Sequence, residues 1–241
     1  MGVSAGPNII EDGLLFAVDP ANTKSYSGSG AGFSDMIKNR PGSVQSQPSF
    51  SSNYNGVWDF SAGNNINVPR TSSDMSDIFG GGFVLTLESW VYPRQFLNYG
   101  CTINNSVGGY WSDTTAGLWI IDSQFVFALG TGDFDENAGG STARVFSGSG
   151  FAVNKWYHLL GTVDGSTSRL YVNGSEVGNS ISTGFITLNR VVNSNPVIIG
   201  GRTTTNANLN ALVGPVYAYN KHFTNAEILQ NYNALKGRFG L

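Results

Sequence analysis

Two segments carry the clearest structural signal in this sequence: WYHLLGTVDG at residues 156–165 and RLYVNG at residues 169–174. Each is a run of apolar, β-branched and aromatic residues that ends in a turn dipeptide, Asp164-Gly165 or Asn173-Gly174. Asn-Gly tolerates the positive φ that a two-residue type I′ turn needs at both central positions. Strands joined by such short turns pair antiparallel, so we expect a meander of three strands here.

Strand-like runs recur between Gly, Asn and Ser clusters from one end of the sequence to the other, with no linker, charge block or repeat between them. We therefore expect one domain over residues 1–241, with a short N-terminal extension. The candidate strands are Leu14–Val18, Val57–Phe60, Phe83–Tyr92, Gly117–Ile121, Phe125–Leu129, Trp156–Val163, Arg169–Asn173, Val197–Gly200 and Val213–Tyr219.

The run Phe83–Tyr92 shows the best alternation of apolar and polar residues. Its apolar side chains fall on one face, whereas Thr86 and Glu88 fall on the other. This pattern predicts a half-buried strand, with one face in the core and one in solvent. Trp90 interrupts the polar face, so its ring either covers the outside of the sheet or lines a concave surface; a structural role is our interpretation.

The end of the sequence predicts a helix. Thr224 and Glu227 have the spacing of a capping box, in which each side chain bonds the backbone N–H of the other residue. An apolar stripe follows at helical spacing. It comprises Ile228, Leu229, Tyr232 and Leu235. We expect this stripe to dock on the sheets and Gly237 to end the helix in the left-handed conformation.

Composition narrows the classes of partner. Gly supplies 32 of the 241 residues, and charged residues make up 12% of them, against about 25% in ordinary globular chains. A formal net charge of -3 and the absence of a Lys or Arg run leave no electrostatic footprint for a phosphate backbone or an anionic membrane. We therefore expect neither nucleic acid nor membrane as a partner.

Cys101 is the only cysteine, so the chain can form neither an internal disulfide nor a zinc site built on cysteines. We expect it to act as a small buried hydrophobe and not as a nucleophile. The start of the sequence lacks the basic stretch and apolar run of a signal peptide, and no apolar segment is long enough to span a bilayer. Export by the general secretory route is therefore not expected.

The two segments at 156–165 and 169–174 resemble the signature of laminin G-like domains, which belong to the concanavalin A-like group. Leu87-Glu88-Ser89-Trp90-Val91 is similar to the early core strand of that family, and Gly214–Tyr219 followed by Thr224–Ile228 is similar to its last strand and helix. The resemblance implies an all-β fold for this chain: an antiparallel two-sheet jelly-roll sandwich with one C-terminal helix.

The two ends resemble a narrower group, the laminin G-like proteins of tailed bacteriophages. The similar residues are Gly6-Pro7-Asn8-Ile9-Ile10, Asp12-Gly13-Leu14 and Asp19-Pro20-Ala21-Asn22 near the start, and Asn231-Tyr232-Asn233-Ala234 and Lys236-Gly237-Arg238-Phe239-Gly240-Leu241 at the close. In that group the domain is usually a structural component of the virion. The resemblance therefore implies localisation in the virion, other virion proteins as partners, and a homo-oligomer or multiple copies on a particle.

The sequence shows no catalytic constellation, so we expect no enzymatic activity, no catalytic residues and no organic cofactor. A retaining glycosidase needs two carboxyl groups about 5 Å apart, but Glu88 has only Thr86 and Trp90 as neighbours on its face of the strand. His158 and His222 belong to no nucleophile elbow, and we expect both to be structural.

A glycine-rich loop holds the candidates for a metal site. Asp133, Asp135 and Asn137 place oxygen ligands at alternate positions, as calcium requires. The loop departs from an EF-hand because its glycine falls at the seventh position, as Gly139, and not at the sixth, and because Arg144 occupies the twelfth position, where a bidentate Glu is needed. A looser calcium site and a solvated acidic loop both stay open as interpretations.

A second loop offers exposed aromatic residues. Tyr110, Trp111 and Asp113 form a candidate platform either for a host glycan or for a protein interface. The leading hypothesis is a virion structural or accessory protein, such as a capsid decoration, neck or tail-fibre component. A carbohydrate-binding adhesin domain is the first alternative, and a glycoside hydrolase is the second.

Overall fold

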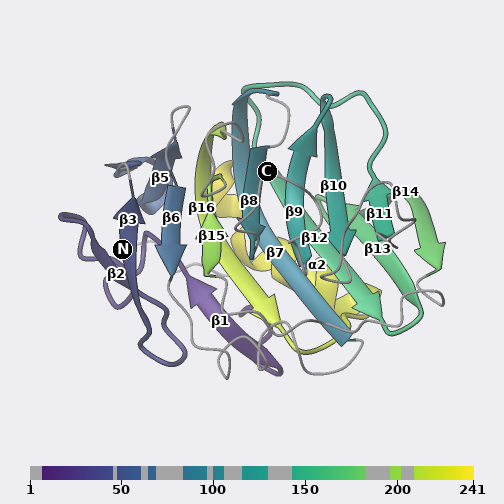
Figure 1. Cartoon of the computed structure of the whole chain (residues 1–241), viewed down its shortest axis with the longest axis horizontal. Coiled ribbons are helices and arrows are strands. Elements are labelled where there is room, and N and C mark those ends of the chain that lie inside the picture. The colour runs from purple at the N-terminus through teal and green to yellow at the C-terminus, as the bar shows by residue number, and fades with distance from the viewer. Residues whose placement is uncertain are drawn as a thin grey trace.

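The computed structural model describes residues 7–45, 48–60, 65–68, 84–96, 100–105, 116–129, 143–182, 196–201 and 209–241. They form two β-sheets packed face to face, with a C-terminal helix on the outside of one of them (Figure 1). The first sheet contains β1 (Leu14–Val18), β4 (Ser49–Ser51), β5 (Val57–Phe60), β7 (Val84–Gln95), β12 (Tyr157–Asp164), β13 (Thr167–Val172), β14 (Ser175–Ser182) and β16 (Asn210–Tyr219). The second sheet contains β2 (Gly32–Ser34), β3 (Pro41–Gln45), β6 (Asn65–Val68), β8 (Gly100–Asn104), β9 (Ala116–Ile121), β10 (Gln124–Leu129), β11 (Ala143–Phe146) and β15 (Val197–Ile199). The helical segments among the described residues are η1 (Asn53–Asn55), α2 (Asn225–Leu235) and η4 (Lys236–Phe239).

Strand order gives the topology. The first sheet runs β14-β13-β12-β7-β16-β5-β4, with β1 also paired to β16, and the second runs β11-β10-β9-β8-β15-β6-β3-β2. Every pairing between described strands is antiparallel. Neighbours such as β7 and β16 are far apart in the sequence because the chain passes repeatedly from one sheet to the other. The predicted fold class, an all-β, antiparallel two-sheet jelly-roll sandwich with a C-terminal helix, is confirmed.

The core lies between the two sheets and takes apolar side chains from both. Leu85 and Leu159 come from the first sheet, and Phe127 comes from the second. Gly161 of β12 faces the Phe127 ring, and a Cβ at this position would lie 2.3 Å from a ring carbon. Because the residue has no side chain, the two sheets can approach closely at this point.

The meander predicted from the opening segments is present as β12, β13 and β14. Asn173 and Gly174 have φ of 52° and 78°, as a two-residue turn of this kind requires. The Asn173 side chain also accepts a hydrogen bond from the backbone N–H of His158, with 2.9 Å between Oδ1 and N. The turn dipeptide is thus fixed by its backbone and by its side chain.

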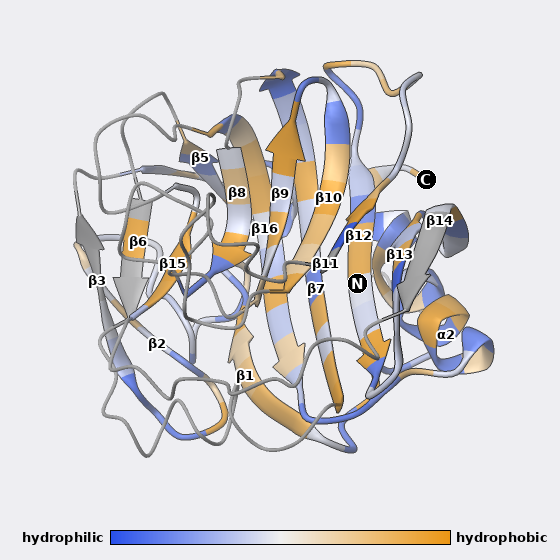
Figure 2. Cartoon of the chain, turned by 45° about the vertical axis from the view of Figure 1, so that its right-hand side comes forward, coloured by the Kyte–Doolittle hydropathy of each residue, from blue (hydrophilic) through white to orange (hydrophobic). Residues whose placement is uncertain are grey.

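The outer face of β7 is not exposed, so the prediction of a half-buried strand is wrong. Thr86, Glu88 and Trp90 are all buried. Helix α2 lies outside the first sheet beside β12 and β13 (Figure 2), and η4 places Phe239 on Trp90 with 4.5 Å between the ring centroids. Trp90 therefore has the structural role that we expected of it, as a ring on the outside of the sheet.

Helix α2 begins with the predicted capping box. Thr224 Oγ1 accepts a hydrogen bond from Glu227 N at 3.3 Å, and Glu227 Oε2 accepts one from Thr224 N at 2.9 Å. Within the described residues, no helix combines the length and the apolar content needed to cross a bilayer.

The predicted stripe docks through Ile228, Tyr232 and Leu235, but the prediction is wrong for Leu229 and for the end of the helix. Ile228 and Asn231 are the buried residues of α2, whereas Leu229 is 46% exposed. The face of the sheet under the helix is partly polar, so the buried face of α2 includes the amide side chain of Asn231. A search for an apolar stripe does not find such a residue. After Leu235 the chain continues through Gly237 as η4, and Gly240 is the residue in the left-handed conformation, with φ of 73°.

Candidate functional site

The outer face of the first sheet holds a buried polar network centred on Glu88 and His158. Both side chains are 0% exposed, and Glu88 Oε1 lies 3.0 Å from His158 Nε2. Asn231 of α2 donates from Nδ2 to Glu88 Oε2 at 2.6 Å and to the Tyr219 hydroxyl at 3.1 Å. Its Oδ1 accepts a hydrogen bond from the backbone N–H of Ile10 at 2.7 Å. The network therefore joins the sheet, the C-terminal helix and the N-terminal segment.

Rings close this network off from solvent. The His158 ring lies 4.9 Å from the Trp90 ring, and Tyr232 stacks parallel to Trp90 at 6.0 Å. Burial, together with the Glu88 carboxylate, raises the pKa of Tyr219 far above its ordinary value, so its hydroxyl stays protonated. A carboxylate in this position has no route to a substrate, and its partner is an imidazole and not the second carboxylate that glycoside hydrolysis needs.

A second polar cluster lies beside the start of α2. Thr86 Oγ1 and Thr162 Oγ1 are 2.8 Å apart, and Thr162 Oγ1 lies 3.1 Å from His222 Nδ1. The Thr86 hydroxyl also donates to the backbone carbonyl of Lys221 at 2.6 Å. Both histidines thus bind neighbouring parts of the fold, which agrees with the structural role expected of them.

Cys101 is buried on β8, as expected, and its thiol donates to the backbone carbonyl of Gly201 at 2.7 Å. Trp119 lies in the same small cluster on the face of the second sheet that points away from the sandwich core. Asn104 Nδ2 donates to the sulfur, and Ile121, Val126 and Ala128 pack in the same cluster, so the surroundings of the thiol are those of a packed side chain.

The segments near the two ends of the described chain pack against each other. Arg238 donates from Nη1 to both carboxylate oxygens of Asp19, from Nε to the Tyr54 carbonyl and from Nη2 to the Gly56 carbonyl. Gln230 Nε2 donates to the carbonyl of Asn8 at 2.9 Å. Residues near the two ends of the sequence therefore form one contact surface.

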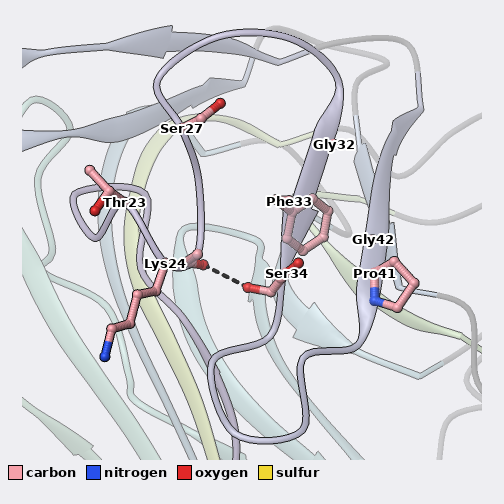
Figure 3. A pocket seen from close by; sticks show the side chains of 9 residues that line it. Thr23, Lys24, Ser27, Gly32, Phe33, Ser34, Pro41 and Gly42 are labelled. Carbon is pink, nitrogen blue, oxygen red and sulfur yellow. Dashed lines mark hydrogen bonds between the residues drawn. The ribbon is translucent and has the colours of Figure 1, made fainter.

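A groove with a volume of about 370 Å³ opens at the edge of the second sheet, between β2, β3 and the loop that precedes them (Figure 3). Most of its lining residues carry a short hydroxyl side chain or are glycine, and the others are one lysine, one phenylalanine and one proline. They are Thr23, Lys24, Ser25, Ser27, Gly32, Phe33, Ser34, Pro41 and Gly42. Sequence reasoning missed this site because its residues come from three segments and form no motif.

The predicted binding residues lie outside the described part of the chain. This holds for the calcium candidates Asp133, Asp135 and Asn137 and for the platform residues Tyr110, Trp111 and Asp113, so both remain predictions. Over the residues that are described, no group of three or more His, Cys, Asp or Glu side chains is arranged to hold a metal ion.

Comparison with solved structures identifies the fold. The binding domain of botulinum neurotoxin DC, solved in complex with rat synaptotagmin II, superposes with a TM-score of 0.69 at 16% identity, covering 92% of this chain and 52% of that one. The binding domain of paraclostridial mosquitocidal protein 1 gives 0.65 at 18%, with the same coverage. Trypanosoma rangeli sialidase gives 0.61 at 14%, covering 94% of this chain and 33% of that one. The chain spans a third to a half of these proteins, and the likeness shows a shared fold only.

Comparison of sequences places the chain in a family. A search of curated proteins finds no match. The family model for the concanavalin A-like lectin/glucanases superfamily matches residues 60–229, which is well over half of the chain. The matched region includes the β12–β13 hairpin and the start of α2, the segments on which the resemblance to laminin G-like domains rests. The chain belongs to the concanavalin A-like lectin/glucanase superfamily.

Proposed function

We propose that this chain is a non-catalytic binding module that serves as a structural or accessory component of a tailed-bacteriophage particle, as a capsid decoration, neck or tail-fibre protein. The observation that carries the non-catalytic part is the closure of Glu88. This carboxylate sits under α2 and η4, bonded to His158 and Asn231, so it supports the sheet and cannot reach a substrate. Members of one fold can be binders or enzymes, and the chemistry of the site decides between them.

The virion assignment rests on the two ends of the sequence. The segments that resemble phage proteins meet in the fold, through Asp19 with Arg238 and Ile10 with Asn231. Because the two segments contact each other, we take their resemblance to phage proteins as a resemblance of the whole domain and not of two unrelated short motifs. The core cluster also takes residues from Phe16 to Ala218, which supports one domain.

The partners that we propose are other virion proteins and further copies of this chain on the particle. A chain with 12% charged residues and a net charge of -3 suits close packing, because it limits repulsion between copies and does not attract nucleic acid. Localisation in the virion follows from the same proposal.

Mass spectrometry of particles banded on a density gradient from the lysate tests this assignment. We expect the chain to band with the capsid and tail proteins in a fixed ratio that a high-salt wash does not change. Recovery only in the soluble fraction, with none in the banded particles, contradicts the virion assignment. Release of reducing sugar from a polysaccharide by the wild type but not by Glu88→Gln contradicts the non-catalytic assignment.

Carbohydrate binding is the second candidate function. It is favoured by the hydroxyl-lined groove beside β2 and β3, which has the size of a small-molecule site. This function is compatible with a virion role, because a particle protein can also contact a host glycan.

A further inference from the structure

We propose that the groove between β2, β3 and the preceding loop binds a saccharide that carries a carboxylate, with Lys24 as the group that recognises the negative charge. This inference rests on the carbohydrate-binding candidate and adds to it a place and a class of ligand. It does not depend on the virion assignment.

The first argument is the unused hydrogen-bonding capacity of the groove. The side chains of Thr23 and Ser34 make no hydrogen bond with any part of the chain that the structure describes, and Ser27 Oγ donates only to the Ser29 carbonyl. Each hydroxyl can both donate and accept. A ligand rich in hydroxyl groups is the natural complement to such a lining, and a volume of about 370 Å³ falls within the range of small-molecule sites.

The second argument is charge. Lys24 is the only charged residue among the described residues of the lining, and its ammonium group forms no ion pair with any of the described residues. Acidic residues near this segment are already neutralised: Asp19 by Arg238, and Asp35 by Arg40 at 2.7 Å. The groove therefore presents one uncompensated positive charge on a chain of net charge -3. One cation matches a carboxylate, with its single charge, better than a phosphate monoester that carries nearly two.

The third argument is that the walls are fixed without a ligand. Ser25 Oγ donates to the Ser34 carbonyl at 3.0 Å, the dashed contact in Figure 3, and Ser34 N donates to the Ser25 carbonyl at 2.8 Å. Tyr26, which follows Lys24 and Ser25 in the sequence, is anchored by its ring against Trp58, with 4.4 Å between the ring centroids. The loop that carries Lys24 is thus tied to β2 and to the core, so little conformational entropy is lost when a ligand enters.

The floor of the groove depends on Gly42. A Cβ at this position would lie 2.0 Å from the Phe33 ring, which packs beneath the strand and is buried. Gly32 differs, because a Cβ there would have no atom of the described residues within 4 Å. Position 32 can therefore accept a charged side chain at the groove without disturbing the fold, which makes it a clean position for a test.

Isothermal titration of the whole chain tests the inference with two carboxylated probes, trigalacturonate and 3′-sialyllactose, against maltotriose as the neutral probe and glucose 6-phosphate as the phosphate probe. We expect binding of at least one carboxylated probe, weakened about tenfold by Lys24→Ala, as loss of one charge contact predicts. Gly32→Asp should weaken it at least as much, by placing a carboxylate beside the ligand. Raising the salt concentration should also weaken it.

Matched controls separate the groove from net charge. Lys155→Ala removes the same charge from an exposed lysine elsewhere, and Gly237→Asp adds the same charge at an open position on η4; both should bind the probe within about twofold of the wild type. The inference is overturned if neither carboxylated probe binds, if Lys24→Ala binds as well as Lys155→Ala, or if maltotriose or glucose 6-phosphate binds more tightly.

Assembly provides the separate readout. We expect Lys24→Ala chains to enter particles as the wild type does while losing the saccharide. Absence of the wild-type chain from particles would remove the virion assignment and leave the groove result unchanged.

Discussion

Arg238 and Asp19 lie 219 positions apart in the sequence and form an ion pair in which Nη1 is 3.0 Å from Oδ1 and 2.9 Å from Oδ2. The two side chains are 10% and 14% exposed. Two further guanidinium contacts, to the carbonyls of Tyr54 and Gly56, fix the same side chain. The planar guanidinium group of Arg238 thus donates to four acceptor oxygens. The ammonium group of a lysine has only three donors and cannot make all four of these hydrogen bonds.

We therefore predict that Arg238→Ala lowers the free energy of unfolding by about 3 kcal/mol, because it leaves Asp19 buried without its partner. Arg238→Lys should recover less than half of that loss, since lysine keeps the charge and loses the fork. Urea unfolding followed by tryptophan fluorescence measures both. Lys236→Ala, in the same segment, is the control and should fall within about 0.5 kcal/mol of the wild type. If Arg238→Lys were as stable as the wild type, the geometry of the guanidinium group would not contribute to stability and the prediction would be wrong.

The buried pair of Glu88 and His158 gives a second prediction. Glu88→Ala should cost about 3 kcal/mol, because it leaves the imidazole and the Asn231 amide without their acceptor. Glu88→Gln should cost about 1 kcal/mol, since an amide still accepts from Asn231. The double variant Glu88→Ala with His158→Ala should cost clearly less than the sum of the two single variants, because the residues share one interaction. Additive losses in urea unfolding would show that the pair is not coupled.

Gly161 provides a steric prediction that involves no charge. Its φ lies outside the left-handed region, so alanine meets no backbone strain there, but its Cβ would overlap the Phe127 ring. We expect Gly161→Ala to destabilise the protein by about 1–3 kcal/mol, as overpacking of a core does. Gly237→Ala, where a Cβ would meet nothing within 4 Å, should leave the melting temperature unchanged or slightly raised. Calorimetry of the two variants compares them directly.

Asp164 gives a prediction about pH. Burial opposes ionisation of its carboxyl, but hydrogen bonds from Ser166, Arg169 and Thr167 outweigh burial and lower the pKa of Asp164 well below its ordinary value. A carboxyl with a depressed pKa in the folded state stabilises the protein above its unfolded pKa of about 3.9, and this contribution is lost as the pH falls further. Asp164→Asn should therefore be less stable than the wild type by about 1 kcal/mol at about pH 7, after allowance for the partly exposed site.

The difference between these two proteins should shrink as the pH falls below about 4, because the Asp164 carboxyl of the wild type is protonated first in the unfolded chain and, at still lower pH, in the folded protein. Urea midpoints of both proteins across this range provide the measurement. A constant difference at every pH would mean that the charge of Asp164 has no part in the turn.

Calcium gives the last prediction. No complete set of ligands is visible in the sequence around Asp133, Asp135 and Asn137, so chelation should change the melting temperature little. Thermal unfolding with EDTA and with saturating calcium measures the effect. Stabilisation by about 2.7 kcal/mol, which a hundredfold excess over the dissociation constant would give, would show a bound ion.

Local chemistry made the hairpin and the helix start predictable from sequence. Asn173 and Gly174 are suited to positive φ, and Thr224 and Glu227 satisfy each other's backbone donors over a distance of three residues. Such features depend on neighbours in the chain, so the sequence contains the information needed to find them.

Features that depend on distant partners could not be predicted in the same way. Strand β2 consists of Gly32, Phe33 and Ser34 and has no alternation to reveal it; it is a strand because β3 pairs with it. The alternation of apolar and polar residues in β7 correctly predicts that Glu88 lies on the face opposite the core. It does not show that α2 covers that face. The partners of Glu88 lie 70 and 143 positions away, and no short motif connects them.

The pairing of β1 with β16 has a consequence for synthesis of the protein. Leu14 is opposite Tyr219 in the β1–β16 pair. The ribosome must therefore add about 200 further residues after β1 before the partner strand β16 has been synthesised. At about 5–20 residues per second this wait is on the order of ten to forty seconds. Throughout it, the buried positions Phe16, Ala17 and Val18 belong to an unpaired strand on the ribosome, where they are open to capture by a chaperone or by a neighbouring nascent chain.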